Sequence, residues 1–323
     1  MVIIYLIKST LCLAVLFGFY KLALENKAMH QFKRFYLLAS LAFAFTIPLI
    51  TFTYETETLT TPVIQDFTQP ILTENFDPEV QRDYTATILW SLYGLGVFIF
   101  GVRFGLNLFR LKRKVNTAQH ITERHFTLAL LERNIIPHSF FKWIFLPKQE
   151  YYTQQIAPEV VAHEATHVRQ KHSLDILFIE ILQVIFWFNP MLWLARVAIK
   201  LNHEFLADQG AIYNKRNIAI YQNILLSYAS SSHHTALESP FNYSLTKKRI
   251  LMLSQTFSRK KVMLRALLLV PVLAGCALLF NQAIVAQEKD ISDAIVADIN
   301  RELEDIENLE LTYPPTSFLN YVL

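Results

Sequence analysis

Four stretches of this sequence are apolar enough to cross a lipid bilayer, and they limit the fold more than any other feature. A membrane-spanning helix needs about 20 apolar residues, and the four runs cover residues 2–20, 35–54, 84–102 and 266–287. Hydrophobic residues make up 53% of the chain, and the mean hydropathy is +0.27, which is high for a soluble domain. The sequence therefore predicts a mostly α-helical, polytopic membrane protein.

A fifth apolar run, residues 181–195, is shorter than a bilayer-spanning helix and contains Pro190. Proline has no amide N–H to continue a helix, so this residue should end one helix and begin another. We expect the run to form an amphipathic or interfacial pair of helices that belongs to the domain between the third and fourth spans.

Basic residues are concentrated between the first two predicted spans and between the third and the fourth. Acidic residues are concentrated in loop 55–83 and in the tail after the fourth span. The basic residues are Lys21, Lys27, Lys33 and Arg34 between the first two spans, Arg103, Arg110, Lys112, Arg113 and Lys114 after the third, and Arg259, Lys260, Lys261 and Arg265 before the fourth. Lysine and arginine accumulate on the cytoplasmic side of membranes. The N-terminus, the acidic loop 55–83 and the acidic tail should therefore lie outside the cytoplasm.

This orientation predicts four parts of the chain. Residues 1–109 form a membrane domain with three spans, residues 110–262 a cytoplasmic domain, residues 263–287 the fourth span, and residues 288–323 a short extracytoplasmic tail. Within the cytoplasmic domain, residues 126–131 fit a strand or a helix, and residues 137–147 fit a short strand and a turn.

The cytoplasmic domain contains the pattern H-E-x-x-H at residues 163–167, inside a helix that should begin near Pro158. Two histidines four residues apart lie about 40° apart around a helix, so His163 and His167 can bind one metal ion. Glu164 lies beside the first histidine and can take a proton from a metal-bound water. This combination is typical of zinc peptidases.

A third ligand is predicted on a later helix, where Glu204 and Asp208 lie four residues apart on one face. Glu204 would complete a site of two histidines and one glutamate with an open fourth position. Asp208 would hydrogen-bond and orient a ligating histidine. Alternatively, the two carboxylates belong to a solvated acidic face of the helix.

The sequence resembles a known family at these residues. H-E-x-x-H followed by E-x-x-x-D is similar to the gluzincin pattern, and the stretch between the two motifs resembles the BlaR/MecR-type membrane metallopeptidases. The resemblance also includes residues on both sides of the motifs and covers roughly residues 1–287. The matching segments are Phe186–Pro190 with Trp193 and Arg196, Pro137–Phe141 and Ile144–Pro147. Two further segments, Phe241–Ser244 and Lys247–Ile250, are similar to members from the Bacteroidetes branch of the family.

The resemblance implies a multi-pass protein of the bacterial inner membrane that holds about one Zn²⁺ per chain. It further implies a cytoplasmic protein substrate, with a transcriptional repressor as the candidate, in signalling across the membrane as an antirepressor. The sequence does not fix the oligomeric state, and a homo-oligomer stays open. The better-known members carry a large extracellular penicillin-binding domain, and the 36-residue tail has no room for one. An external cue would then arrive through a partner at loop 55–83 or at the tail, or the tail has no partner.

Two other functions remain open from the sequence. The metal site could be purely structural, in a non-enzymatic scaffold or signal relay, although such a site does not need a base such as Glu164. Alternatively, the protein could be a quality-control protease of the membrane. A formal net charge of +3 argues against direct binding of nucleic acid.

Several further patterns are interpreted as unrelated to the chemistry. Ser244–Lys247 fits the S-x-x-K of penicillin-binding proteins, but its companion motifs are missing. Residues 273–276 resemble a lipoprotein box inside the last span, where packing of small residues is the better interpretation. His233 and His234 should lie in a solvated loop. His172 and His203 are interpreted as surface residues or neighbours of the ligands, with stabilisation of the tetrahedral oxyanion as the alternative. Cys12 and Cys276 are interpreted as packing residues.

Overall fold

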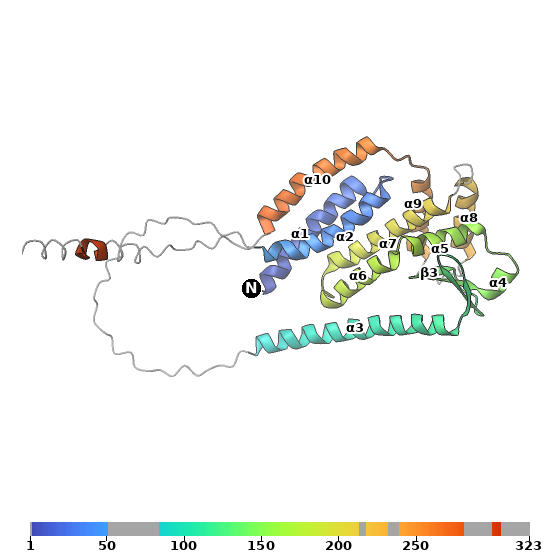
Figure 1. The fold of residues 1–323 in the computed structure, drawn as a ribbon, viewed down its shortest axis with the longest axis horizontal. Helices are drawn as coiled ribbons and strands as arrows, with labels where there is room; N and C mark the ends of the chain where they lie inside the picture. The colour runs from blue at the N-terminus through green and yellow to red at the C-terminus, as the bar shows by residue number, and fades with distance from the viewer. Residues whose placement is uncertain (1, 51–83, 213–217, 232–238, 281–298, 305–323) are drawn as a thin grey trace, which may run out of the picture. The chain divides into compact units, whose positions relative to one another are not determined.

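The computed structural model describes residues 2–50, 84–212, 218–231, 239–280 and 299–304 (Figure 1). Residues 1–50 and 78–281 belong to one compact unit, which contains every element discussed below. Of the second unit, residues 51–77 and 282–323, only the helical segment 299–304 is described. Loop 55–83, most of the tail, and His233 and His234 lie outside the described residues.

Four helices coincide with the predicted spans, and each is long and apolar enough to cross a membrane. They are α1 (Val2–Phe19) with its π-helical extension Tyr20–Leu24, α2 (His30–Thr46) with the 3-10 turn Ile47–Leu49, α3 (Thr85–Thr117), and α10 (Arg259–Phe280). The prediction of a mostly helical protein with four candidate spans is confirmed. Three helices extend past the apolar runs into basic residues, because lysine and arginine are good helix formers.

A four-stranded sheet follows α3. Its strands are β1 (Gln119–Thr122), β2 (Thr127–Leu131), β3 (His138–Phe140) and β4 (Trp143–Pro147), in the order β1-β2-β4-β3. β2 and β4 are parallel, whereas β1 and β3 are antiparallel to their neighbours. The structure thus resolves residues 127–131 as a strand rather than a helix. The apolar side chains of β2 and β4 pack against helix α5 (Pro158–Arg169), which carries H-E-x-x-H and begins at the expected proline.

The remaining helices surround the motif. They are the short α4 (Lys148–Tyr152), then α6 (His172–Ile185), α7 (Pro190–Ala211), α8 (Ile218–Ser231) and α9 (Ser239–Leu253). α7 packs closely on α5 because Gly210 has no side chain. A Cβ atom at this position would collide with the side chain of Thr166 on α5.

Helices α6 and α7 share one apolar core with the spans α1, α2 and α10. Ile179 of α6 and Leu192 of α7 are fully buried in it, together with Leu16 and Leu41 of the first two spans. Cys12 and Cys276 are also buried in this core, which confirms that both are packing residues. The helix that carries Glu204 is therefore packed directly against candidate membrane spans.

As expected, the fifth apolar run divides into two helices at Pro190, and the connection between α6 and α7 adds contacts with the spans. Within four residues it contacts three spans: Phe186 stacks on Phe45 of α2, Trp187 packs on Gly96 of α3, and Asn189 donates to the Thr10 hydroxyl of α1 at 3.0 Å. Thr10 and Gly96 lie well inside their spans. The run therefore packs alongside the spans, because it is apolar and Asn189-Pro190 makes a tight turn.

Candidate metal centre

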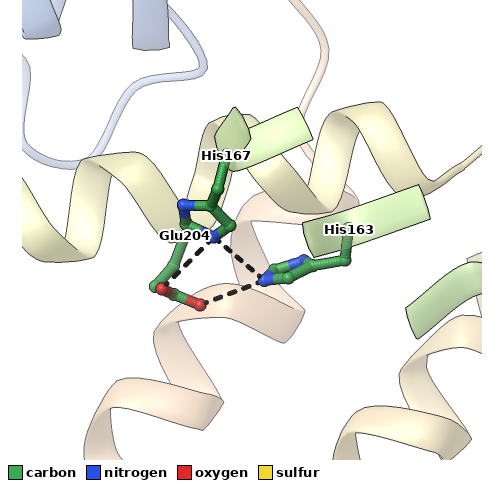
Figure 2. A group of neighbouring side chains, drawn as sticks. All are labelled: His163, His167 and Glu204. Carbon is green, nitrogen blue, oxygen red and sulfur yellow. Dashed lines mark hydrogen bonds and ion pairs between the residues drawn. The ribbon is translucent and has the colours of Figure 1, made fainter. Parts of the chain in front are cut away.

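Three side chains converge on one point between α5 and α7 (Figure 2). The Nε2 atoms of His163 and His167 are 3.2 Å apart. One carboxylate oxygen of Glu204 lies 3.4 Å from the His163 Nε2, and the other lies 3.7 Å from the His167 Nε2. The structure thus brings together the three predicted ligands from α5 and α7, two helices between which α6 lies in the sequence.

These separations suit a zinc ion. Zinc binds histidine nitrogen and carboxylate oxygen at about 2.0–2.2 Å in tetrahedral geometry, which places neighbouring ligand atoms about 3.3 Å apart. Two nitrogens and one oxygen also form the donor set of catalytic zinc sites, in which the fourth position is left for water or substrate. The residues present therefore fit the metal.

The Nδ1 atom of His163 faces two buried polar side chains. It lies 3.2 Å from the carboxylate of Asp208 and 2.9 Å from the hydroxyl of Tyr221, which in turn donates to Asp208 at 2.8 Å. Burial by itself would lower the pKa of His163, but the carboxylates of Asp208 and Glu204 outweigh it and raise the pKa to about 9. Asp208 is thus placed as expected, where it can fix the orientation of the ring.

The second histidine has a different partner. Nδ1 of His167 lies 2.9 Å from Nδ1 of His172, and Nε2 of His172 lies 3.2 Å from the side-chain oxygen of Gln170. Burial and the neighbouring His203 lower the pKa of His172 to about 2, which keeps this ring neutral. A neutral His172 can accept a hydrogen bond from the His167 Nδ1–H while it donates to Gln170. The ligating Nε2 of His167 is then free for the metal.

His203 belongs to a buried connection between the site and the second span. Its ring stacks on His172, with centroids 4.0 Å apart, and its Nε2 lies 2.8 Å from the carboxylate of Asp175. Asp175 accepts two hydrogen bonds from the guanidinium of Arg34 on α2 at 2.6 and 3.2 Å. Neither His172 nor His203 is a surface residue.

Arg249 of α9 closes the site from the other side. Its guanidinium donates to both oxygens of Asp208 at 2.6 and 3.0 Å and lies 3.0 Å from a carboxylate oxygen of Glu204. Burial would raise the pKa of both carboxylates, but their contacts with His163 and Arg249 hold each pKa below its usual range. The two acids are therefore kept ionised, as metal binding and ring orientation require.

Glu164 faces a cavity of about 330 Å³ that is also lined by the three ligands. The strand β3 contributes His138 and Ser139 to the wall, and the helices α8 and α9 contribute Tyr221, Tyr228 and Arg249. Burial raises the pKa of Glu164, while nearby His163 and a hydrogen bond from the Ser139 hydroxyl act in the opposite direction. A carboxylate with a raised pKa is a suitable proton acceptor near neutral pH.

Sequence reasoning did not assign roles to Tyr221 and Arg249. Each lies on a helix after α7, and the spacing of a tyrosine or an arginine along an amphipathic helix does not indicate a metal-site contact. The sequence indicates that His172 lies near the ligands but does not indicate that His167 is its partner. Arg249 lies in the matching segment Lys247–Ile250, which marks the residue but not its contact. All three contacts depend on how α5, α6, α7, α8 and α9 pack.

A helical protein with candidate membrane spans, two histidines and a glutamate around one point, and a second glutamate in the same cavity has the architecture of a membrane metallopeptidase. The profile of the BlaR1 peptidase M56 family matches residues 35–253. Since this match covers more than half of the chain, the protein belongs to that family, which confirms the predicted BlaR/MecR-type resemblance.

Two curated relatives have similar sequences. Regulatory protein BlaR1 of Bacillus licheniformis is 25% identical over 177 residues, which cover 50% of this chain and 29% of the relative. Regulatory protein BlaR1 of Staphylococcus aureus is 25% identical over 227 residues, which cover 64% of this chain and 36% of the relative. The chain thus matches only about a third of the length of these relatives.

Proposed function

We propose that this protein is a membrane-embedded zinc metallopeptidase that hydrolyses peptide bonds of a cytoplasmic protein. The observation that carries the proposal is the convergence of the two Nε2 atoms and the Glu204 carboxylate within 3.2–3.7 Å of one another. Glu164 lines the same cavity. A purely structural metal site does not require an additional carboxylate in an open cavity beside the ligands.

The residues have distinct roles in this mechanism. His163, His167 and Glu204 would hold the zinc, which supplies Lewis acidity that polarises the scissile carbonyl and acidifies water. Glu164 accepts a proton as the oxygen of the water attacks the carbonyl carbon. It then donates this proton to the amine nitrogen as the C–N bond breaks. Asp208 and Arg249 keep the ligands oriented and ionised.

The sheet provides a place for an extended substrate. β3 lies at the edge of the sheet and pairs with β4 on one side, and its residues His138 and Ser139 line the cavity. An extended peptide can add to such an edge through main-chain hydrogen bonds. This position would bring a substrate bond to the metal and Glu164, which favours cleavage within an extended segment of a protein.

The test compares the wild type with Glu164→Gln in nanodiscs, using a quenched fluorescent peptide library. We expect cleavage by the zinc-loaded wild type and a loss of about 10²–10⁴-fold in rate for the variant, because Gln cannot accept the proton. Both proteins should bind about one zinc per chain by elemental analysis. Equal cleavage by the two proteins would disprove the assigned base, and loss of zinc in the variant would point to a structural role of Glu164.

The proposed orientation places the zinc site in the cytoplasm and loop 55–83 and the tail outside. It is supported by the basic residues at the ends of α1–α2, α3 and α10. Single cysteines at Thr60 and Ser231 provide the test with an impermeant maleimide on spheroplasts. The cysteine at position 60 should be labelled and the one at 231 only after permeabilisation. Labelling at 231 in intact spheroplasts would exclude a cytoplasmic substrate.

We further propose that the cleaved protein is a transcriptional repressor and that an external partner provides the cue at loop 55–83 or at the tail. Both matched relatives are described as regulatory proteins, which supports a signalling role. Deletion of residues 292–323 should abolish the response of proteolysis to the inducing condition if the tail receives the cue. An unchanged response would leave loop 55–83 as the candidate.

A further inference from the structure

A second cavity, of about 350 Å³, lies between the α1–α2 turn and the beginning of α10. Lys27 lines it from the turn, and Lys261 and Arg265 line it from the first two turns of α10. The segment before α10 contributes three hydroxyl groups, which belong to Ser254, Thr256 and Ser258. None of these residues lines the metal cavity, so the two cavities are separate.

The chemistry of this cavity fits a phosphate group. It is lined by three cationic side chains, three hydroxyls and the amide of Gln255, and none of the described residues in its wall is acidic. Ammonium, guanidinium and hydroxyl groups are the donors that bind phosphate oxygens through charge-assisted hydrogen bonds. An Arg fork adds geometric selectivity for a phosphate over a spherical anion.

The position of the cavity favours a lipid over a soluble anion. It lies where the first candidate span ends and the second and fourth candidate spans begin. The next residues of α10 point apolar side chains outward: Met263 is 78% exposed, Leu264 61% and Leu267 68%. Such a surface would contact acyl chains in a bilayer, and a basic pocket beside it lies at the depth of the headgroups.

We propose that this cavity binds the headgroup phosphate of an anionic phospholipid, with its acyl chains along α10. Lys261 and Arg265 would contact the phosphate from one wall and Lys27 from the other. The lipid would thereby join the α1–α2 turn to the beginning of α10. The proposal does not depend on the metal site or on any peptidase activity.

The test uses the full-length protein, delipidated in a neutral detergent and titrated with phosphatidylglycerol under native mass spectrometry. The double variant Lys261→Gln/Arg265→Gln removes two charges from the cavity. The matched control, Arg259→Gln/Lys260→Gln, removes two charges from the same helix, from residues that do not line the cavity. We expect the cavity variant to bind more than about tenfold more weakly and the control to change by less than about threefold.

Further measurements distinguish specific binding of an anionic lipid from binding of a zwitterionic lipid, of free phosphate, or through general electrostatic attraction. Phosphatidylcholine with the same acyl chains should bind more weakly than phosphatidylglycerol, and millimolar inorganic phosphate should not displace the lipid. Equal weakening by both double variants would show general electrostatic attraction and overturn the proposal. So would unchanged binding by the cavity variant or displacement by free phosphate. If the double variant does not fold, Lys27→Gln tests the opposite wall: weaker phosphatidylglycerol binding supports the site, and unchanged binding overturns it.

Discussion

The two ends of helix α7 differ in how they are held. At its N-terminal end, the connection to α6 contacts the spans mainly through aromatic and small residues, such as Phe186 on Phe45 and Trp187 on Gly96. At its other end, Glu204 and Asp208 belong to a buried network of ion pairs and hydrogen bonds around the metal site. About 22 Å of continuous helix separates Asn189 from Glu204.

Mutations at the two ends of α7 should therefore change different properties, namely stability at the connection and metal affinity at the metal site. Apolar packing at the connection contributes to stability, because it buries surface without requiring a particular charge. The network at the metal end determines ligand orientation and ionisation, which affect metal affinity far more than folding. We therefore expect changes at the metal end to alter zinc binding with little effect on the unfolding of the metal-free protein, and changes at the connection to do the reverse.

The largest effect is expected for Glu204→Ala. It removes one of the three proposed ligands, so zinc content measured by elemental analysis should fall close to zero, and the proposed peptidase activity should be lost with it. Glu123→Ala, in the exposed turn after β1, is the control and should retain the metal. Unchanged zinc content in Glu204→Ala would mean that the third ligand is assigned incorrectly.

His172→Ala should weaken zinc binding by about 10–100-fold, because the His167 ring loses the acceptor of its Nδ1–H. Affinity would be measured by competition with a chromogenic chelator, and the cobalt-substituted protein should show an altered absorption spectrum. His120→Ala, at an exposed histidine of β1, should leave both measurements unchanged. His172→Asn, which retains an acceptor, should recover part of the affinity. A His172→Ala protein with wild-type affinity would contradict the role.

At the other end of α7, Gly96→Ala introduces a Cβ atom into the side chain of Trp187. Overpacking of this kind costs about 1–3 kcal/mol, and thermal unfolding in detergent should report it. Gly94→Ala is the matched control on the same helix, where a Cβ atom has no neighbour within 4 Å. Zinc affinity should be the same in both variants. A specific loss of zinc in Gly96→Ala would show that the connection also controls the metal site.

The smallest effect is expected for Asn189→Ala. The Asn189 side chain accepts from the Met191 amide at 2.9 Å and so caps α7. Loss of an N-cap costs about 1 kcal/mol, which should lower the unfolding temperature slightly without changing zinc affinity. Asn189→Ser keeps a cap acceptor without placing a carboxylate in this buried position, and it should recover part of the stability. If Asn189→Ser is as unstable as Asn189→Ala, the bond to Thr10 contributes more than the cap.

The sequence was sufficient to predict four candidate spans and the three side chains that the structure brings together as a candidate metal site, for a simple physical reason. Both depend on regularities that a helix repeats along the chain. About 20 apolar residues match the bilayer, and a spacing of four places His163 with His167, and Glu204 with Asp208, on one helical face. The predicted ends of the spans were less accurate than their positions, since hydropathy does not indicate how far a helix continues beyond the apolar run into basic residues. The domain division and the orientation stay predictions.

Contacts between helices that are distant in the chain could be found only in the tertiary structure. Arg249 reaches Asp208 from 41 residues away, Tyr221 reaches His163 from 58, and Arg34 reaches Asp175 from 141. Local periodicity carries no information about such pairs, because packing of apolar faces decides which polar residues meet. The same holds for the turn Phe186–Asn189. The apolar run and Pro190 predicted an amphipathic or interfacial pair of helices, whereas only the packed helices showed that the turn lies against three spans.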